Sequence, residues 1–86
     1  MKEFTYTITD PVGIHARPAG LLAKAAKALD STITIAKADG KSAAATKLMA
    51  LMGLGITGGD TIIVTGEGGD VDANLQTVKQ FLTEHL

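Results

Sequence analysis

The chain has 86 residues, of which 45% are hydrophobic, so it is long enough for one modest core, and we expect residues 1–86 to form a single domain. Cysteine is absent and aromatic residues make up only 3%, which excludes a disulfide scaffold and argues against a stacking platform for single-stranded nucleic acid. No stretch approaches the roughly 18 apolar residues of a membrane span. The first residues also lack an apolar signal segment, so we expect a cytoplasmic protein without membrane insertion.

Charge is distributed unevenly along the chain. The formal net charge is −1, which argues against non-specific binding to nucleic acid. Residues 1–50 nevertheless hold seven of the eight Lys and Arg residues and four of the nine Asp and Glu residues. We therefore expect a site for an anion or an acidic partner in the first half of the chain.

The first predicted elements are a strand and a helix. Aromatic and aliphatic residues alternate with threonine over residues 4–8, which is typical of a half-buried strand. The segment 10–13 contains Pro and Gly and predicts a turn. Apolar residues then recur at helical spacing over 16–29, which predicts a helix that begins at His15 or Ala16.

Five further elements follow. Their expected bounds are, in chain order, a strand over 32–37, a return strand over 42–45, a short helix over 48–52, a strand over 61–65 and, last, a helix that begins after Asp70. Asp39-Gly40 predicts the hairpin turn between the first two of these strands. Thr46 is expected to be the N-cap of the short helix and Gly53 to end it.

The order of these elements is βαββαβα, which indicates an α+β fold. Several amphipathic helices that need one common apolar surface predict an antiparallel sheet with the helices on one face.

Two glycine-rich segments are interpreted as turns. Residues 53–58 match G-x-G-x-x-G, but a dinucleotide site needs a strand before the motif and a helix after it, and here the order is reversed. A nucleotide-dependent enzyme is therefore the weakest hypothesis, and 66–69 is likewise expected to be a loop. The chain has only two histidines and no His-x-x-x-His pair, so we expect no histidine-rich metal site and no cofactor. His85, at the end of the last helix, is interpreted as a solvated surface residue.

The short helix carries two methionines whose role the sequence leaves open. Met49 and Met52 alternate with Leu48 and Leu51. Such residues are ordinarily buried in a core, but flexible methionine side chains on one short helix also suit an adaptable docking surface.

The segment Gly13-Ile14-His15-Ala16-Arg17-Pro18-Ala19 combines three features that suit phosphoryl chemistry. His15 falls at the start of a helix, where unpaired N–H groups and the helix dipole favour an anion. Arg17 carries a planar guanidinium that matches a phosphate, and Pro18 has no N–H to lose in the first helical turn. This arrangement predicts transient phosphorylation of His15, and the alternative is an N-cap histidine beside an unrelated arginine.

The same segment resembles the active-site signature of the HPr family, the histidine-containing phosphocarriers of the bacterial phosphoenolpyruvate:sugar phosphotransferase system. The resemblance covers the whole chain and extends to Gly40-Lys41-Ser42 and to the segment 48–56. It implies an open-faced β-sandwich, in which three helices cover one face of a four-stranded antiparallel sheet. It also implies a monomeric carrier, not an enzyme in the strict sense, that holds no metal.

The resemblance assigns roles to single residues and to partners. It implies that His15 accepts a phosphoryl group on Nδ1 from enzyme I and passes it to IIA components of sugar permeases. Arg17 would stabilise the phosphoryl group, while Ala16 and Pro18 would shape the start of the helix. The residues expected to dock partners are Thr46, Lys47, Leu48, Met49, Met52, Lys24 and Lys27.

One position departs from the family pattern. Many members from low-GC Gram-positive bacteria carry a regulatory serine where this chain has Lys47, with Thr46 one residue earlier. The lysine puts regulation of the serine type in doubt for this chain, and modification of Thr46 instead is the alternative. The alternative to a sugar-transport carrier is a regulatory or specialised paralogue, in a nitrogen-linked or dihydroxyacetone-linked phosphotransfer chain.

Overall fold

The computed structural model describes residues 2–86 and contains four strands and three helices in the predicted order βαββαβα. Their bounds are β1 Lys2–Thr7, α1 Ala16–Lys27, β2 Thr32–Lys37, β3 Ser42–Ala44, α2 Leu48–Gly53, β4 Thr61–Glu67 and α3 Val71–His85. The predicted elements are all present, and their ends lie within two residues of the sequence prediction.

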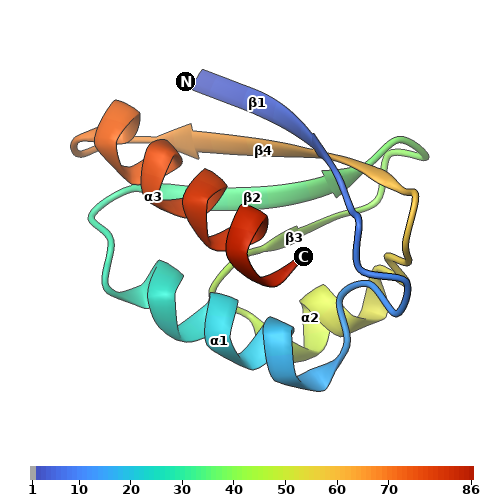
Figure 1. Ribbon diagram of the computed structural model, residues 1–86. Coiled ribbons are helices and arrows are strands. Elements are labelled where there is room, and N and C mark those ends of the chain that lie inside the picture. The colour runs from blue at the N-terminus through green and yellow to red at the C-terminus, as the bar shows by residue number, and fades with distance from the viewer. Residues whose placement is uncertain (1) are drawn as a thin grey trace.

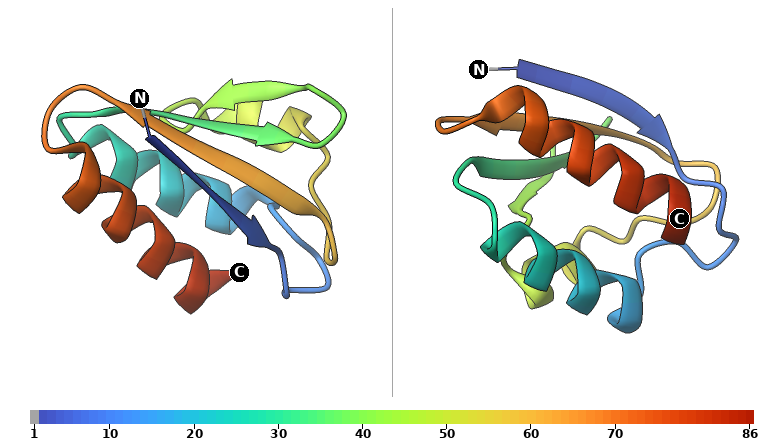
Figure 2. Two further views of the ribbon diagram at one scale, coloured as in Figure 1. Left: turned by 90° about the horizontal axis from the view of Figure 1, so that it is seen from above. Right: turned by 60° about the vertical axis from the view of Figure 1, so that its left-hand side comes forward.

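The four strands form one antiparallel sheet in the order β1-β4-β2-β3. Tyr6 of β1 lies opposite Ile62 of β4, and Ile35 of β2 lies opposite Val64 of β4, so inward-facing side chains of neighbouring strands share rows. All three helices lie on one face of this sheet, and the other face is left open (Figures 1 and 2). The predicted α+β open-faced β-sandwich is thereby confirmed.

The core lies between the sheet and the helices and is built almost entirely from aliphatic side chains. Its largest fully buried members are Ile8, Leu22, Ile35, Leu51, Ile56, Ile62, Val64 and Leu82. The three aromatic residues, Phe4, Tyr6 and Phe81, are only partly buried and pack against the edge of this core. The hydroxyl group of Tyr6 donates a hydrogen bond to the Leu82 carbonyl at 3.1 Å.

Thr46 is not the N-cap of the short helix, contrary to the prediction. Lys47 occupies that position, its carbonyl accepts the first helical bond from the Leu51 N–H at 3.0 Å, and no side chain caps the helix. The Lys47 N–H donates to the Ala44 carbonyl at 3.0 Å, which closes a backbone turn after β3. Because of this turn, α2 begins one residue later than an N-cap at Thr46 would require. The Thr46 hydroxyl is therefore free of a capping role.

The expected loop at 66–69 is also corrected, because β4 continues through Gly66 and Glu67. Gly66 is buried, and a Cβ there would lie 2.9 Å from Cγ2 of Val71 and 3.0 Å from Cδ2 of Leu75. The glycine is therefore needed because α3 packs directly over the end of the strand, while Gly68 and Gly69 make the turn.

A polar cluster joins the end of α1 to the start of α3, and we call it the Asp30 cluster: Asp30, Ser31, Gly68, Asp70 and Asn74. Ser31 donates its hydroxyl to the Gly68 carbonyl at 2.6 Å and accepts from Asn74 Nδ2 at 2.7 Å. Asn74 Nδ2 also donates to Asp30 Oδ1, and the Asp70 N–H donates to the same oxygen at 3.3 Å. The hydrogen bond from Asn74, helped by the one from Asp70, holds the pKa of Asp30 below its ordinary value.

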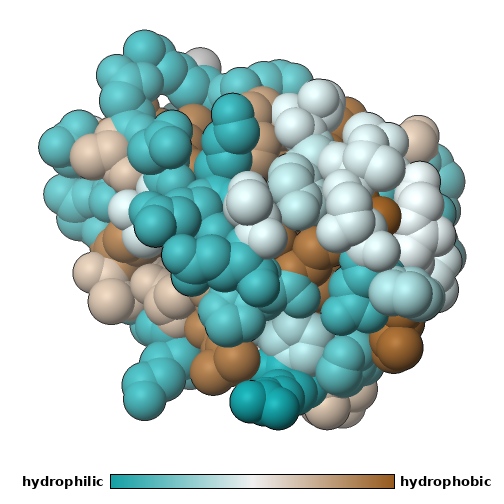
Figure 3. Space-filling model, in the orientation of Figure 1, coloured by the Kyte–Doolittle hydropathy of each residue, from teal (hydrophilic) through white to brown (hydrophobic). Residues whose placement is uncertain are grey.

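The surface over α1 and α3 is mostly hydrophilic. Figure 3 looks onto these helices and shows hydrophobic side chains as separate areas between hydrophilic ones. Within the part of the chain that the structure describes, no helix is both long and apolar enough to cross a membrane.

Candidate functional site

His15 stands at the N-cap of α1 with its side chain exposed. Its imidazole makes no capping hydrogen bond, so the ring is not used to hold its own helix. The N–H groups of Ala16 and Arg17 have no backbone acceptor within residues 2–86, as expected for the first turn of a helix. The ring therefore lies beside donors that favour an anion.

The backbone around His15 is held against the glycine-rich stretch that follows α2. The Ile14 N–H donates to the Ile56 carbonyl at 3.0 Å. Gly13 has a φ of +79°, and a Cβ there would overlap the Ile56 carbonyl oxygen. A Cβ on Gly58 would likewise lie 2.7 Å from the Asp10 carbonyl oxygen. Two loops thus pack backbone to backbone because both carry glycine at the contact.

The glycine-rich stretch is therefore more than the helix stop and turn that the sequence predicted. It forms the support on which the His15 loop is fixed, and its G-x-G-x-x-G spacing has no part in binding a dinucleotide phosphate, since no helix follows it.

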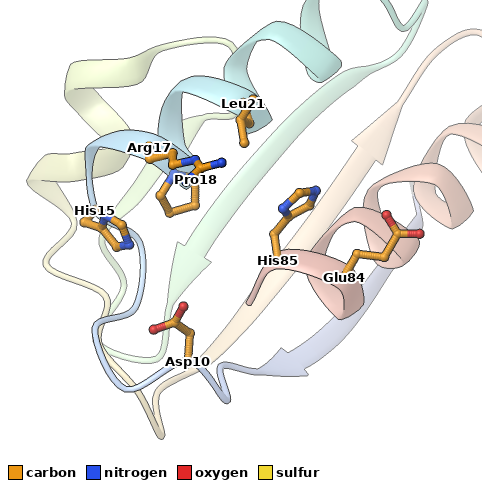
Figure 4. Close-up of a pocket in the computed structure, with 7 residues that line it drawn as sticks. All are labelled: Asp10, His15, Arg17, Pro18, Leu21, Glu84 and His85. Atoms are coloured by element: carbon orange, nitrogen blue, oxygen red, sulfur yellow. The ribbon is translucent and has the colours of Figure 1, made fainter.

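The His15 side chain borders a surface hollow of about 270 Å³, which we call the His15 hollow. Its lining residues are Asp10, His15, Arg17, Pro18, Leu21, Glu84 and His85 (Figure 4). They come from the loop after β1, from the first turns of α1 and from the last turn of α3. Two segments about 70 residues apart in the chain thus form opposite walls of one site.

Arg17 is available to an external anion. It is exposed, and it forms no ion pair within residues 2–86, where the one salt bridge joins Lys2 to Asp72 at 2.8 Å. The two carboxylates of the hollow are held by their own neighbours, because Asp10 Oδ1 accepts the Val12 N–H at 2.9 Å and Glu84 Oε1 accepts Gln80 Nε2 at 3.2 Å. Arg17 is therefore a positive group without an internal partner.

The two remaining residues of the predicted signature take different places. Ala16 is exposed in the first turn of α1, whereas Pro18 is buried there and also lines the hollow. The buried ring of Pro18 fixes the start of the helix, and its missing N–H falls where no helical acceptor exists.

Sequence reasoning missed four residues of the hollow: Asp10, Leu21, Glu84 and His85. His85 is exposed, as predicted, but it also lines the hollow, and its ring lies against the Phe81 ring with a tilt of 33° and ring centroids 4.4 Å apart. No local spacing joins these residues to His15. The available signal was that α1 and α3 cover the same sheet face, which brings the end of one helix close to the start of the other.

The apolar residues predicted to dock partners are exposed on α2, which packs against α1 (Figure 1). The exposed fractions of Leu48, Met49 and Met52 are 38%, 76% and 38%, whereas Leu51 is fully buried. The alternative in which the two methionines belong to the core is therefore wrong. Exposed methionines are suited to adaptable contacts.

The predicted docking lysines and Thr46 lie outside the His15 hollow. Lys47 and Lys24 are exposed, at the N-cap of α2 and on α1. Lys27 ends α1, about 18 Å along the helix axis from His15 at ~1.5 Å per residue. There, Lys27 and the half-buried Thr46 border a second hollow of about 330 Å³. The structure thus does not bring Lys27 and Thr46 to the site around His15.

Among the described residues, 2–86, no group of three or more His, Asp or Glu side chains is arranged to hold a metal ion. The chemistry that this site can perform with its own groups is that of an exposed imidazole next to an unpaired guanidinium and free backbone donors, which suits a transferable anion.

Comparison with known proteins agrees with this geometry. A family model described as the PTS HPr component phosphorylation site matches residues 2–84. The chain belongs to the HPr family. Phosphocarrier protein HPr of Mycoplasma capricolum is 39% identical over 84 residues, which cover 98% of this chain and 93% of the relative. Phosphocarrier protein HPr of Streptomyces coelicolor is 38% identical over 74 residues, which cover 86% and 80%.

A solved structure shows the same HPr fold. The crystal structure of HPr-C-His from Thermoanaerobacter tengcongensis is similar with a TM-score of 0.89 at 31% identity, covering 98% of this chain and 93% of that one. This chain is therefore a phosphocarrier of the phosphotransferase system. A carrier of the HPr family takes up and passes on a group, which fits the expectation that the chain is not an enzyme in the strict sense.

Proposed function

We propose that His15 is the phosphoryl acceptor of this chain, that enzyme I donates the group at the expense of phosphoenolpyruvate, and that IIA components of sugar permeases receive it in the cytoplasm. The observation that carries the proposal is the combination of an exposed, non-capping His15 with the unpaired Arg17 at one hollow. A group that must be charged and discharged by partners has to remain accessible and free of internal hydrogen bonds.

The transfer balances without a cofactor. Nδ1 of a neutral His15 ring attacks the phosphorus with its lone pair, a nitrogen–phosphorus bond forms, and the bond from phosphorus to the donor atom of enzyme I breaks with its electron pair left on that atom. The His15 ring keeps its proton on Nε2. In the second transfer the acceptor attacks in the same way and the His15 ring leaves as the neutral imidazole.

The protein contributes position and charge to both transfers. The phosphoryl group is best stabilised when its oxygens meet fixed donors at the moment of transfer. Arg17 and the N–H groups of Ala16 and Arg17 supply such donors, and Pro18 fixes the backbone that carries them. The backbone contact between Ile14 and Ile56 keeps His15 in place while partners change.

Partners are proposed to dock on the surface beside this site. The apolar contacts come from Leu48, Met49 and Met52 and the positive charges from Lys24 and Lys47, whereas Lys27 and Thr46, also predicted to dock partners, border the second hollow away from His15. Separate hydrophobic areas between charged side chains suit complexes that form and dissociate quickly, because positive charge steers acidic partners without a large apolar interface.

The test is incubation of the full chain with phosphoenolpyruvate and enzyme I, followed by measurement of protein-bound phosphate. We expect one acid-labile phosphoryl group in the wild type and none in His15→Ala. Arg17→Gln is expected to slow the transfer about 100-fold while leaving the thermal midpoint unchanged, and Arg17→Lys to slow it less. Lys41→Gln is the matched control, since this exposed lysine lies in the β2–β3 hairpin away from the hollow.

Phosphate that survives in His15→Ala contradicts the proposal. A second assay compares acceptors. Transfer to IIA components of sugar permeases supports the sugar-transport role, whereas transfer only to acceptors of nitrogen-linked or dihydroxyacetone-linked chains assigns the alternative of a specialised paralogue.

A further inference from the structure

The fixed charges around the His15 hollow do not balance a phosphoryl group. Arg17 is the one permanently positive side chain in its lining, and Asp10 and Glu84 are two negative ones. A phosphoryl group adds nearly two further negative charges near neutral pH, and the one positive charge of a phosphorylated His15 ring that keeps its Nε2 proton offsets only part of them. A second positive group in the wall would therefore have a large effect on how stable the phosphorylated form is.

His85 is the remaining ionisable residue in that wall, and the fold holds the main chain beside it. The main-chain oxygen of Leu86, the next residue, accepts the N–H of Thr9 at 2.7 Å, the N–H of Asp10 at 2.8 Å and the Thr9 hydroxyl at 2.7 Å. We call this arrangement the Leu86 clasp. Phe81 belongs to the preceding turn of α3. The clasp thus holds the main chain next to His85, and the Phe81 ring lies against the His85 side chain.

The orientation of the His85 ring suits contact with an anion in the hollow. In Figure 4 the ring rises from the end of α3 toward the side of the hollow that α1 forms, while the Glu84 carboxylate points away from it. The Glu84 carboxylate is also bound by Gln80 at 3.2 Å. Of the two neighbouring residues at the end of α3, the one that can become positive faces the site and the negative one is turned aside.

We propose that protonated His85 is a second cationic ligand of the phosphoryl group on His15. The inference rests on the proposed role of His15. A protonated imidazole donates N–H to a phosphoryl oxygen, which is a charge-assisted hydrogen bond. Histidine is the side chain that ordinarily changes charge between about pH 5 and 8, so the phosphorylated carrier gains stability as His85 takes up a proton.

Other ionisable groups face His85 and enter the balance. They are Asp10 in the loop after β1, His15 and Arg17 at the start of α1, and Glu84 on its own helix. Comparison of variants that differ only at residue 85 separates the contribution of His85 from theirs, because all four are unchanged in every variant.

The experiment measures the equilibrium constant for phosphoryl transfer between phosphorylated enzyme I and the full chain at pH 5.5 and pH 8.5. The pH dependence of enzyme I cancels in the ratio of wild type to variant. We expect the equilibrium constant of the wild type to favour the phosphorylated carrier about fivefold more than that of His85→Gln at pH 5.5, which is the effect of one exposed charge pair. At pH 8.5 we expect the two constants to be equal. Because lysine stays positive at both pH values, the equilibrium constant of His85→Lys should exceed that of His85→Gln at pH 5.5 and at pH 8.5.

Lys79→Gln is the matched control, because it removes one positive charge from α3 outside the hollow and should leave the constant unchanged. Equal constants for wild type and His85→Gln at pH 5.5 overturn the inference. A loss of the same size at both pH values also overturns it, because that result indicates a packing effect. If the wild type takes up no phosphoryl group, or if His15→Ala still does, the proposed function itself fails and this inference fails with it.

Discussion

The two ends of α1 use polar side chains in opposite ways. At the C-terminal end, in the Asp30 cluster, Asp30, Ser31 and Asn74 satisfy one another and the backbone of the turn before α3. At the N-terminal end, His15 makes no capping bond and Arg17 no ion pair within residues 2–86, although the backbone beneath them is locked. One end uses its polar groups for the fold, and the other keeps them for a partner.

At the His15 end, different groups therefore provide the stability of the backbone and the chemistry of the site. The His15 end is held by backbone contacts between loops, so its side chains do not have to stabilise the protein. Substitution of its exposed side chains is therefore expected to change transfer without changing stability, and substitution in the Asp30 cluster is expected to do the reverse.

Gly13→Ala should break the lock at the His15 end. The new Cβ overlaps the Ile56 carbonyl oxygen, and the φ of +79° is unfavourable for alanine. We expect a loss of about 3 kcal/mol in the free energy of unfolding, measured by urea denaturation, together with slower phosphoryl uptake because the loop must move. Gly20→Ala in α1 is the control: a Cβ there meets nothing within 4 Å, and the variant should be more stable by about 0.5–1 kcal/mol.

If Gly13→Ala has the same free energy of unfolding as the wild type, the contact between the two loops does not hold the His15 site in place. The proposed difference between the two ends of α1 would then be contradicted.

Asn74→Ala tests the other end. It removes two donated hydrogen bonds, to Asp30 and to the buried Ser31 hydroxyl, and leaves that hydroxyl with one partner fewer. We expect about 2 kcal/mol of destabilisation and an unchanged rate of phosphoryl transfer below the melting temperature. Gln76→Ala, at an exposed position of the same helix, should stay within about 0.5 kcal/mol of the wild type. Slower transfer in folded Asn74→Ala would contradict the independence of the two ends.

The smallest expected effect is a pH dependence that originates in Asp30. Since the pKa of Asp30 is lowered in the folded state, the folded protein favours the carboxylate, and the stabilisation is present above the ordinary value of 3.8 and is lost as the pH falls through the folded pKa. The difference in unfolding free energy between wild type and Asp30→Asn should be constant from pH 7 to 5 and smaller at pH 3. Urea denaturation at the three pH values measures it, and a difference that grows at pH 3 would contradict the assignment.

Much of the fold could be predicted because its signals are local. The alternation over 4–8, the Asp39-Gly40 turn and the helical spacing after His15 each lie within one element and were confirmed. The errors fall where tertiary contact overrides a local preference. Thr46 has the preferred chemistry for an N-cap, but a backbone turn displaces the helix start to Lys47. Gly66 belongs to β4 because it pairs with Lys2 and Ile33, and α3 packs over it.

The site could be predicted only in part for the same reason. His15, Arg17 and Pro18 share one short segment, and the sequence brings them together without help from the fold. Glu84 and His85 reach the hollow only because α3 returns over the sheet, and the support from Gly58 depends on how two loops approach. Periodicity and spacing carry no information about such distant neighbours.

The Leu86 clasp has a consequence for the order of events during synthesis. Its hydrogen bonds join Thr9 to a residue 77 positions later, so the wall that carries Glu84 and His85 cannot form until the chain has been made through residue 86 and α3 has folded onto the sheet. A nascent or partly unfolded chain exposes His15 without the opposite wall. Closing a loop of this length has an entropic cost that must be met before the contact stabilises the fold, so we expect the complete site only in molecules in which α3 has docked.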